Sequence, residues 1–119
     1  PNSFRHVFDR PIAAQQLAKD YFHLRQLLNE LGYDASILVG PEANHIGDPA
    51  QRGDTYASEF LKNDGHSVDF ATWHQYYLNG REAKVMDFIN PAVFNRLINE
   101  INYFQKAIND SGRNVKMWL

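Results

Sequence analysis

Cysteine is absent from this chain of 119 residues. Its absence excludes disulfide bonds, a thiolate nucleophile and cysteine-ligated zinc or iron–sulfur centres. No apolar run approaches the roughly 18 residues that a membrane span needs, and no glycine-rich phosphate loop is present. A large excess of charge of one sign is also lacking, since the chain has twelve Lys and Arg and fourteen Asp and Glu. We therefore expect no general attraction to nucleic acid or to a membrane surface.

The overall composition is typical of a globular protein. About 44% of the residues are apolar and 22% are charged, which argues against disorder. The histidines are not spaced as metal ligands, so we expect no metal site and no cofactor. One domain of this length can bury a core, whereas two could hardly fit.

The first periodic signal is an apolar set at steps of four and three residues, which lies on one face of a helix. This set comprises Leu17, Tyr21, Leu24, Leu28 and Leu31. Asp9 and Pro11 favour a start for this helix, and Gly32 favours its end.

Three strands and two more helices are expected further along the chain. The continuous run Ile37-Leu38-Val39 is typical of a strand covered on both faces, and Gly40-Pro41 should end it. A loop over 42–53 precedes a helix over 55–62, capped by Asp54 and ended by the Asn-Asp-Gly that follows. The remaining elements are a strand over 68–77, a turn over 78–81, a helix that begins at Asn90-Pro91 and a strand over 115–119.

Alternating helices and strands predict an α/β fold with a mostly parallel sheet. Three strands leave both sheet edges open, so a segment of a larger sheet or barrel fits better than a complete small domain. The chain also ends on the apolar residues Met117-Trp118-Leu119, whereas natural termini are usually polar. We therefore expect a piece of a longer protein.

Two carboxyl ends of predicted strands carry polar side chains, and function gathers at such ends in parallel α/β folds. One is Gly40-Pro41-Glu42, and the other contains His74 and Tyr76. The period of two in a strand places His74 and Tyr76 on the same face. On the inside of a barrel, the imidazole and the phenol would both point into its mouth. The alternative is that both side chains serve packing alone.

Several stretches together resemble the heparanase family. They are Pro1-Asn2-Ser3-Phe4, the first strand through Glu42, Thr72-Trp73-His74-Gln75-Tyr76-Tyr77-Leu78-Asn79-Gly80, Asp87-Phe88-Ile89-Asn90-Pro91 and Val115-Lys116-Met117-Trp118-Leu119. The long stretch from Thr72 is the most specific, and the order and spacing of all five agree with the family.

The resemblance implies a retaining endo-β-glucuronidase that cleaves internal β-glucuronide bonds of heparan sulfate-type glycosaminoglycans. It implies a (β/α)₈ TIM-type barrel with a small β-sandwich appended, to which this chain contributes about three parallel strands alternating with helices. Residues 1–119 would be the central barrel segment, from just after the acid/base strand to just before the nucleophile. Both catalytic glutamates would lie outside the chain, so this segment alone should be inactive.

Roles for individual residues follow from the same resemblance. Tyr76 would donate a hydrogen bond to the nucleophile, with His74 beside it. Asn2, Glu42 and Asn44 would border the substrate cleft. The implied partners are heparan sulfate-type polysaccharide and the remaining barrel and β-sandwich of the parent, and the implied location is secreted or lysosomal.

The stretch after Gly40-Pro41 departs from the family, which carries a dense Lys/Arg cluster there. In residues 42–63 this chain has only Arg52 and Lys62, against four acidic residues: Glu42, Asp48, Asp54 and Glu59. Strong binding of sulfated polysaccharide through this stretch is therefore not expected, and a less sulfated substrate would suit it better. Two alternatives stay open: a non-catalytic heparan sulfate-binding relative, and an unrelated small α/β binding module that folds alone.

Overall fold

The computed structural model describes residues 11–119 of the chain. Asp9, expected near the first helix start, lies outside these residues. The elements in order are α2 (Ala14–Glu30), β1 (Val39–Ala43), α3 (Gly53–Asn63), β2 (Phe70–Trp73), the 3₁₀ helix η1 (Val85–Ile89), α4 (Pro91–Phe94), α5 (Arg96–Ser111) and β3 (Lys116–Trp118). Both neighbouring strand pairs are parallel, and the sheet order is β1-β2-β3. The expected α/β class with three parallel strands is confirmed.

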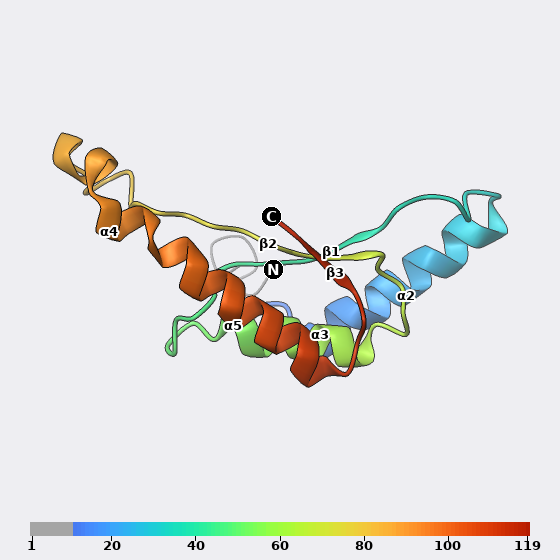
Figure 1. The fold of residues 1–119 in the computed structure, drawn as a ribbon. Helices are drawn as coiled ribbons and strands as arrows, with labels where there is room; N and C mark the ends of the chain where they lie inside the picture. The colour runs from blue at the N-terminus through green and yellow to red at the C-terminus, as the bar shows by residue number, and fades with distance from the viewer. Residues whose placement is uncertain (1–10) are drawn as a thin grey trace.

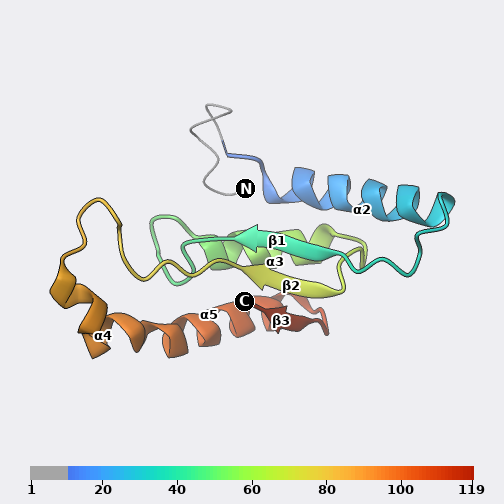
Figure 2. The same cartoon turned by 90° about the horizontal axis from the view of Figure 1, so that it is seen from above.

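The long helices lie on one face of the sheet. Figure 1 shows α2, α3 and α5 below the strands, and Figure 2 shows α3 between the other two. The core lies in this layer: the Trp73 ring from β2 stacks on Phe104 of α5 at a centroid distance of 5.6 Å. On the α2 side, Tyr21 meets Phe60 of α3 edge to face at 5.1 Å. Burial of these rings removes the largest apolar surfaces of the chain from water.

Helix α2 forms as predicted, and its predicted apolar stripe is confirmed in part, since Leu17, Tyr21 and Leu28 are half-buried. Ala14 and Ala18 are buried, whereas Leu24 is exposed and Leu31 is 65% exposed. The reason is that the second half of α2 extends past the sheet (Figure 1). In the first half, Ala14 and Ala18 lie in the core and Leu17 packs against it.

Arg25 also ties this second half of α2 to the loops that precede β1 and β2. Its guanidinium donates to the carbonyl of Ser36 at 2.7 Å, to that of Ser67 at 3.0 Å and to the Asp69 carboxylate at 2.6 Å. The backbone N–H of Leu38 also donates to Asp69. This hydrogen bond first, and then Arg25, lower the pKa of Asp69 below its ordinary value.

Strand boundaries differ from the prediction at both strand ends that matter for the site. Ile37 precedes β1 and is 64% exposed, and Gly40-Pro41 lies inside β1 and does not end it. Strand β2 ends at Trp73, so residues 74–77 follow the strand and are not part of it. Runs of apolar residues indicated the strands, but the positions at which each strand begins and ends depend on its backbone pairing with the neighbouring strand.

Helix starts were predicted with mixed success. Asn90 caps α4 as expected, accepting from the Ala92 N–H at 3.0 Å, but the predicted long helix is divided at Asn95 into α4 and α5. The predicted cap Asp54 is wrong, because the residue before α3 is Arg52 and no side chain caps that end. The predicted end of α3 at Asn63 is confirmed, and α5 ends before Gly112, which takes the left-handed conformation that favours glycine, with φ 75°.

The other face of the sheet carries no helix among residues 11–119 (Figure 1). Phe70 and Trp118 lie in contact there at a ring distance of 5.1 Å, and Trp118 is 52% exposed. In the described part of the chain, no helix is long and apolar enough to span a membrane.

Candidate functional site

Glu42 stands in a bulge at the carboxyl end of β1. The pairing register with β2 shifts between Pro41 and Ala43, and Glu42 between them has φ 59°. Its backbone N–H donates to Thr72 Oγ1 at 3.3 Å, which ties the bulge to β2. The extra residue redirects the Glu42 side chain relative to a regular strand.

His74 is the first residue after β2 and meets the Glu42 carboxylate. The His74 backbone N–H donates to the Ala43 carbonyl at 2.8 Å, so the two strand ends stay joined. His74 Nε2 lies 2.8 Å from Glu42 Oε2. For this hydrogen bond Nε2 carries the proton, which fixes the orientation of the ring. Both side chains are part-exposed, 45% for His74 and 37% for Glu42, so water reaches the pair.

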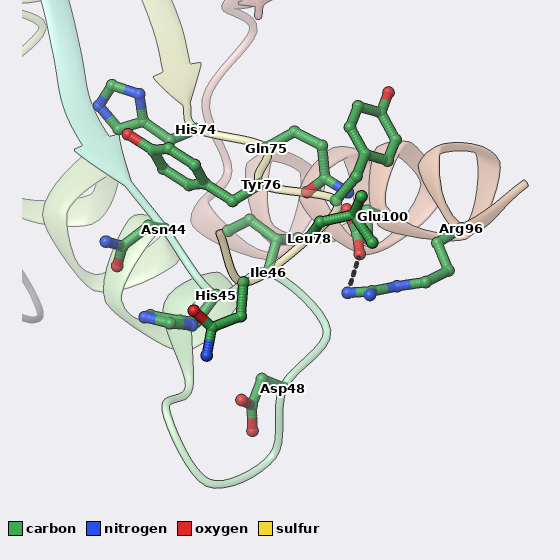
Figure 3. A pocket seen from close by; sticks show the side chains of 12 residues that line it. Asn44, His45, Ile46, Asp48, His74, Gln75, Tyr76, Leu78, Arg96 and Glu100 are labelled. Carbon is green, nitrogen blue, oxygen red and sulfur yellow. Dashed lines mark hydrogen bonds and ion pairs between the residues drawn. The ribbon is translucent and has the colours of Figure 1, made fainter. Parts of the chain in front are cut away.

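Tyr76 lies beside His74. The two rings are 6.1 Å apart between centroids with an interplanar angle of 35°, and Figure 3 shows the side chains next to each other. Tyr76 is 71% exposed, so its hydroxyl is open to a ligand or to another part of a larger protein. A phenol in this position donates one hydrogen bond and accepts others.

A phenolic layer lies beneath Glu42. Tyr21 from α2 packs against the backbone of Gly40, where an added Cβ would lie 2.7 Å from Tyr21 Cε1. Burial, and then the Glu42 charge, raise the pKa of Tyr21. Burial, and then Tyr21, raise the pKa of Tyr56 to about 12. Both phenols are therefore neutral at physiological pH.

A pocket of about 400 Å³ adjoins His74 and Tyr76 (Figure 3). The loop after β1, the segment after β2 and the first turns of α5 provide its walls. The lining residues are Asn44, His45, Ile46, Asp48, His74, Gln75, Tyr76, Tyr77, Leu78, Asn79, Arg96 and Glu100.

Glu100 is the buried acidic residue of this pocket. It is 6% exposed; one carboxylate oxygen accepts from Arg96 Nη2 at 3.1 Å, and the other has no hydrogen-bond partner. The amide nitrogen of Gln75 is also buried without a partner, and Figure 3 shows the Gln75 side chain reaching toward Glu100.

The sequence reasoning missed Glu100. Its signal was its place three residues after Leu97 and four before Phe104, where the apolar period put an inward-facing side chain. An acidic residue at a core position is a marker of a polar site.

Of the predicted site residues, the structure brings four to the carboxyl end of the sheet: Glu42, Asn44, His74 and Tyr76. Asn2 lies outside the described residues. Glu42 does not line the pocket but contacts His74, which does, so its place beside the substrate stays a prediction. Among residues 11–119, no group of three or more His, Asp or Glu side chains could hold a metal ion.

A parallel sheet flanked by helices, with a polar site at the carboxyl ends of its strands, defines a segment of a TIM-type α/β barrel. No protein-family model matches the chain. Inactive heparanase-2 of Mus musculus is 35% identical over 120 residues, and that of Homo sapiens is equally similar. Heparanase of Bos taurus is 33% identical over 119 residues.

Each of these matches covers 100% of this chain but only 20–21% of the relative. The chain is therefore a relative of the heparanases and of heparanase-2 along its whole length, which confirms the predicted resemblance. It spans about a fifth of the length of these curated relatives.

Proposed function

We propose that residues 1–119 are the central segment of a (β/α)₈ glycoside hydrolase that cleaves internal β-glucuronide bonds in heparan sulfate-type polysaccharide. The observation that carries the proposal is the group formed by Glu42, His74 and Tyr76 at the carboxyl ends of two parallel strands. This is the edge at which TIM-type barrels assemble their active sites. The similarity to heparanases along the whole chain supports the same reading.

The proposed reaction uses two glutamates that lie outside these 119 residues, one just before Pro1 and one just after Leu119. In a retaining glycosidase, two carboxyl groups stand about 5–5.5 Å apart. One attacks the anomeric carbon and the other protonates the leaving oxygen, after which water releases the sugar. This chain would supply the surroundings of both groups, and the isolated segment would have no activity.

Within this scheme, Tyr76 donates its hydroxyl proton in a hydrogen bond to the nucleophile and keeps it ionised and aimed. His74 lies beside it and borders the bound sugar. Glu42 acts through His74, because its carboxylate accepts a hydrogen bond from Nε2 and orients the ring. Asn2 and Asn44 border the substrate.

The proposed partners are the polysaccharide, the remaining barrel strands and the β-sandwich of the longer protein. The open face of the sheet, with Phe70 and Trp118, suits the interior of such a barrel. We place the longer protein in the secretory route or the lysosome. Fractionation of expressing cells tests this placement, and recovery in the cytosol alone would contradict it.

Hydrolysis by the longer protein is the direct test. Incubation with heparan sulfate should release new reducing ends, and proton NMR of early products should show retained anomeric configuration. Tyr76→Phe should lower kcat roughly tenfold to a thousandfold, since one hydrogen bond to the nucleophile is lost. Tyr33→Phe, at an exposed tyrosine on the far loop after α2, is the matched control. Absence of new reducing ends with the unaltered protein rejects the hydrolase.

A second candidate is a non-catalytic heparan sulfate-binding relative. Its support is that two relatives at 35% identity carry the name inactive heparanase-2. Binding of heparan sulfate without any release of reducing ends selects this candidate. Hydrolysis rejects it.

A further inference from the structure

We infer that the pocket beside His74 and Tyr76 is a subsite for an uncharged, unsulfated sugar ring, and that Glu100 and Asp48 exclude sulfate from it. The inference rests on the proposed function, because it assumes that a glycan chain crosses this edge of the sheet. It adds the chemical class of the ring that this pocket accepts.

The shape of the pocket suits one part of a glycan chain. Its volume of about 400 Å³ lies within the range of about 300–1,000 Å³ that is typical of small-molecule sites. It opens directly beside His74 and Tyr76, so a chain bound at these residues extends into it (Figure 3). The amide and phenol side chains of Gln75, Tyr77 and Asn79 provide polar groups of the kind that bind hydroxyls.

The pocket has a negative charge that is only partly compensated. Glu100 is almost fully buried, and one of its oxygens has no hydrogen-bond partner. A charge removed from water in this way is screened much less than a surface charge. Asp48 adds a second carboxylate, held in place because its Oδ1 accepts from the N–H groups of Ala50 and Gln51.

The lining carries one guanidinium against two carboxylates. Among the described residues that line it, Arg96 is the one Lys or Arg, and its guanidinium donates to Glu100. The ring of His74 faces Glu42 through Nε2. A sulfate brought here would therefore meet two carboxylates and one guanidinium, whose charge is already paired with that of Glu100.

Hydrogen bonding also distinguishes a hydroxylated sugar ring from a sulfated one. A sugar hydroxyl donates a proton to a carboxylate, whereas a sulfate ester has only acceptor oxygens. A hydroxylated ring can donate a hydrogen bond to Asp48, whereas a sulfated ring meets the like charges of Asp48 and Glu100. Such a juxtaposition of acceptor with acceptor selects against the wrong ligand.

Equilibrium binding to the longer protein tests this inference without depending on hydrolysis. Calorimetry compares an unsulfated N-acetylated heparosan oligosaccharide with the same oligosaccharide carrying N- and 6-O-sulfate. We expect the unsulfated form to bind more tightly. Glu100→Gln, which keeps the side-chain size but removes the charge, should reduce this preference by roughly tenfold.

Three variants distinguish charge from shape and folding. Asp48→Asn keeps the Oδ1 acceptor for the loop and should reduce the preference in the same direction. Glu100→Asp keeps the charge and should keep most of the preference. Glu30→Gln removes an equal charge at the exposed end of α2 and should leave the preference unchanged.

The outcomes separate this inference from the proposed function. Equal or tighter binding of the sulfated oligosaccharide, or an unchanged preference in both Glu100→Gln and Asp48→Asn, overturns the inference. Failure of both oligosaccharides to bind also overturns it. Selective binding of the unsulfated form without any hydrolysis supports the inference and rejects only the hydrolase.

Discussion

Glu42 has a backbone conformation that few residues with a side chain adopt. Its φ of 59° lies in the left-handed region, which costs about 1 kcal/mol or more for a non-glycine residue. This conformation positions the side chain: from the bulge, the Glu42 carboxylate reaches His74, which follows the neighbouring strand. A regular continuation of β1 would give a different direction to this side chain.

Replacing Glu42 by Gln tests its action on His74. We expect kcat/KM of the longer protein toward heparan sulfate to fall roughly tenfold, because the ring loses the charged acceptor that orients it. Stability should change by less than about 1 kcal/mol, since both side chains are part-exposed and screened by water. The pKa of Tyr21 should also move down toward its ordinary value of 10.0, because the Glu42 charge contributes to raising it.

Glu30→Gln is the control for the charge change, and Glu42→Asp tests whether the carboxylate alone is sufficient. Unchanged kcat/KM in Glu42→Gln would show that the contact with His74 has no role in the reaction.

Tyr56 makes the stability of the fold dependent on pH in the alkaline range. Burial raises the pKa of Tyr56 to about 12 in the folded state, against an ordinary value of 10.0, so folding favours the neutral phenol. This contribution is fully present below pH 10 and is lost as pH rises from 10 to 12. Tyr56→Phe should therefore lose less stability than the unaltered protein between pH 9 and pH 11.

At pH 7 the same variant should be equally stable or more stable by up to about 1 kcal/mol, because the Tyr56 hydroxyl is buried without a partner. Chemical denaturation of the longer protein at pH 7, 9 and 11 measures the free energy of unfolding, with Tyr33→Phe as an exposed control. A clear loss of stability at pH 7 would indicate that the hydroxyl has a partner in the folded protein.

At the scale of elements, the sequence predicted helices better than the surfaces they bury. The Asn90-Pro91 pair indicated the helical segment that holds α4 and α5, and the apolar period indicated α2. The same period failed for Leu24 and Leu31, because burial depends on whether the sheet extends beneath them. A helical period describes one face of a helix, not what lies opposite.

A buried ion pair joins the end of α3 to the chain that enters β3. Asp64 is fully buried and pairs with Arg113, and it also accepts from the Val68 N–H at 3.2 Å. Arg113 in turn donates to the Val68 carbonyl at 3.3 Å. The pair therefore fixes the loops at the amino ends of β2 and β3 together.

Asp64→Asn should destabilise the longer protein by about 3–5 kcal/mol, because Arg113 would keep its charge in a buried place without a counter-ion. Chemical denaturation measures the loss. The matched control is Asp110→Asn, which breaks the exposed pair with Lys106 on α5 and should change stability by less than about 0.5 kcal/mol. Equal effects of the two variants would contradict the proposed role of the buried pair.

At the scale of the whole molecule, the described residues form an extended body. The radius of gyration is 15.8 Å, with extents of 52 × 32 × 25 Å. A compact domain of this length has a radius of gyration of about 13.5 Å. The difference agrees with the uncovered sheet face and with η1 and α4, which project beyond the sheet (Figure 2).

We therefore expect the isolated 119 residues to lack a cooperative thermal transition. Exposed apolar side chains on η1 and α4, such as Met86 and Phe88, and the open sheet face should bind a hydrophobic dye and promote aggregation. Differential scanning calorimetry and dye fluorescence measure both properties. A single sharp transition without dye binding would support the alternative of a small α/β module that folds alone.

The sequence by itself determined the order of helices and strands, the parallel α/β class and the strand ends at which polar residues gather. These features depend on local periods and on residues such as Gly112, whose conformational preferences act over a few positions. Only the tertiary structure decided that Glu42 pairs with His74, that Glu100 lies beneath a pocket and that Leu31 stays in water. Each of these depends on which residues meet across long separations in the chain, through backbone pairing and packing that no local pattern encodes.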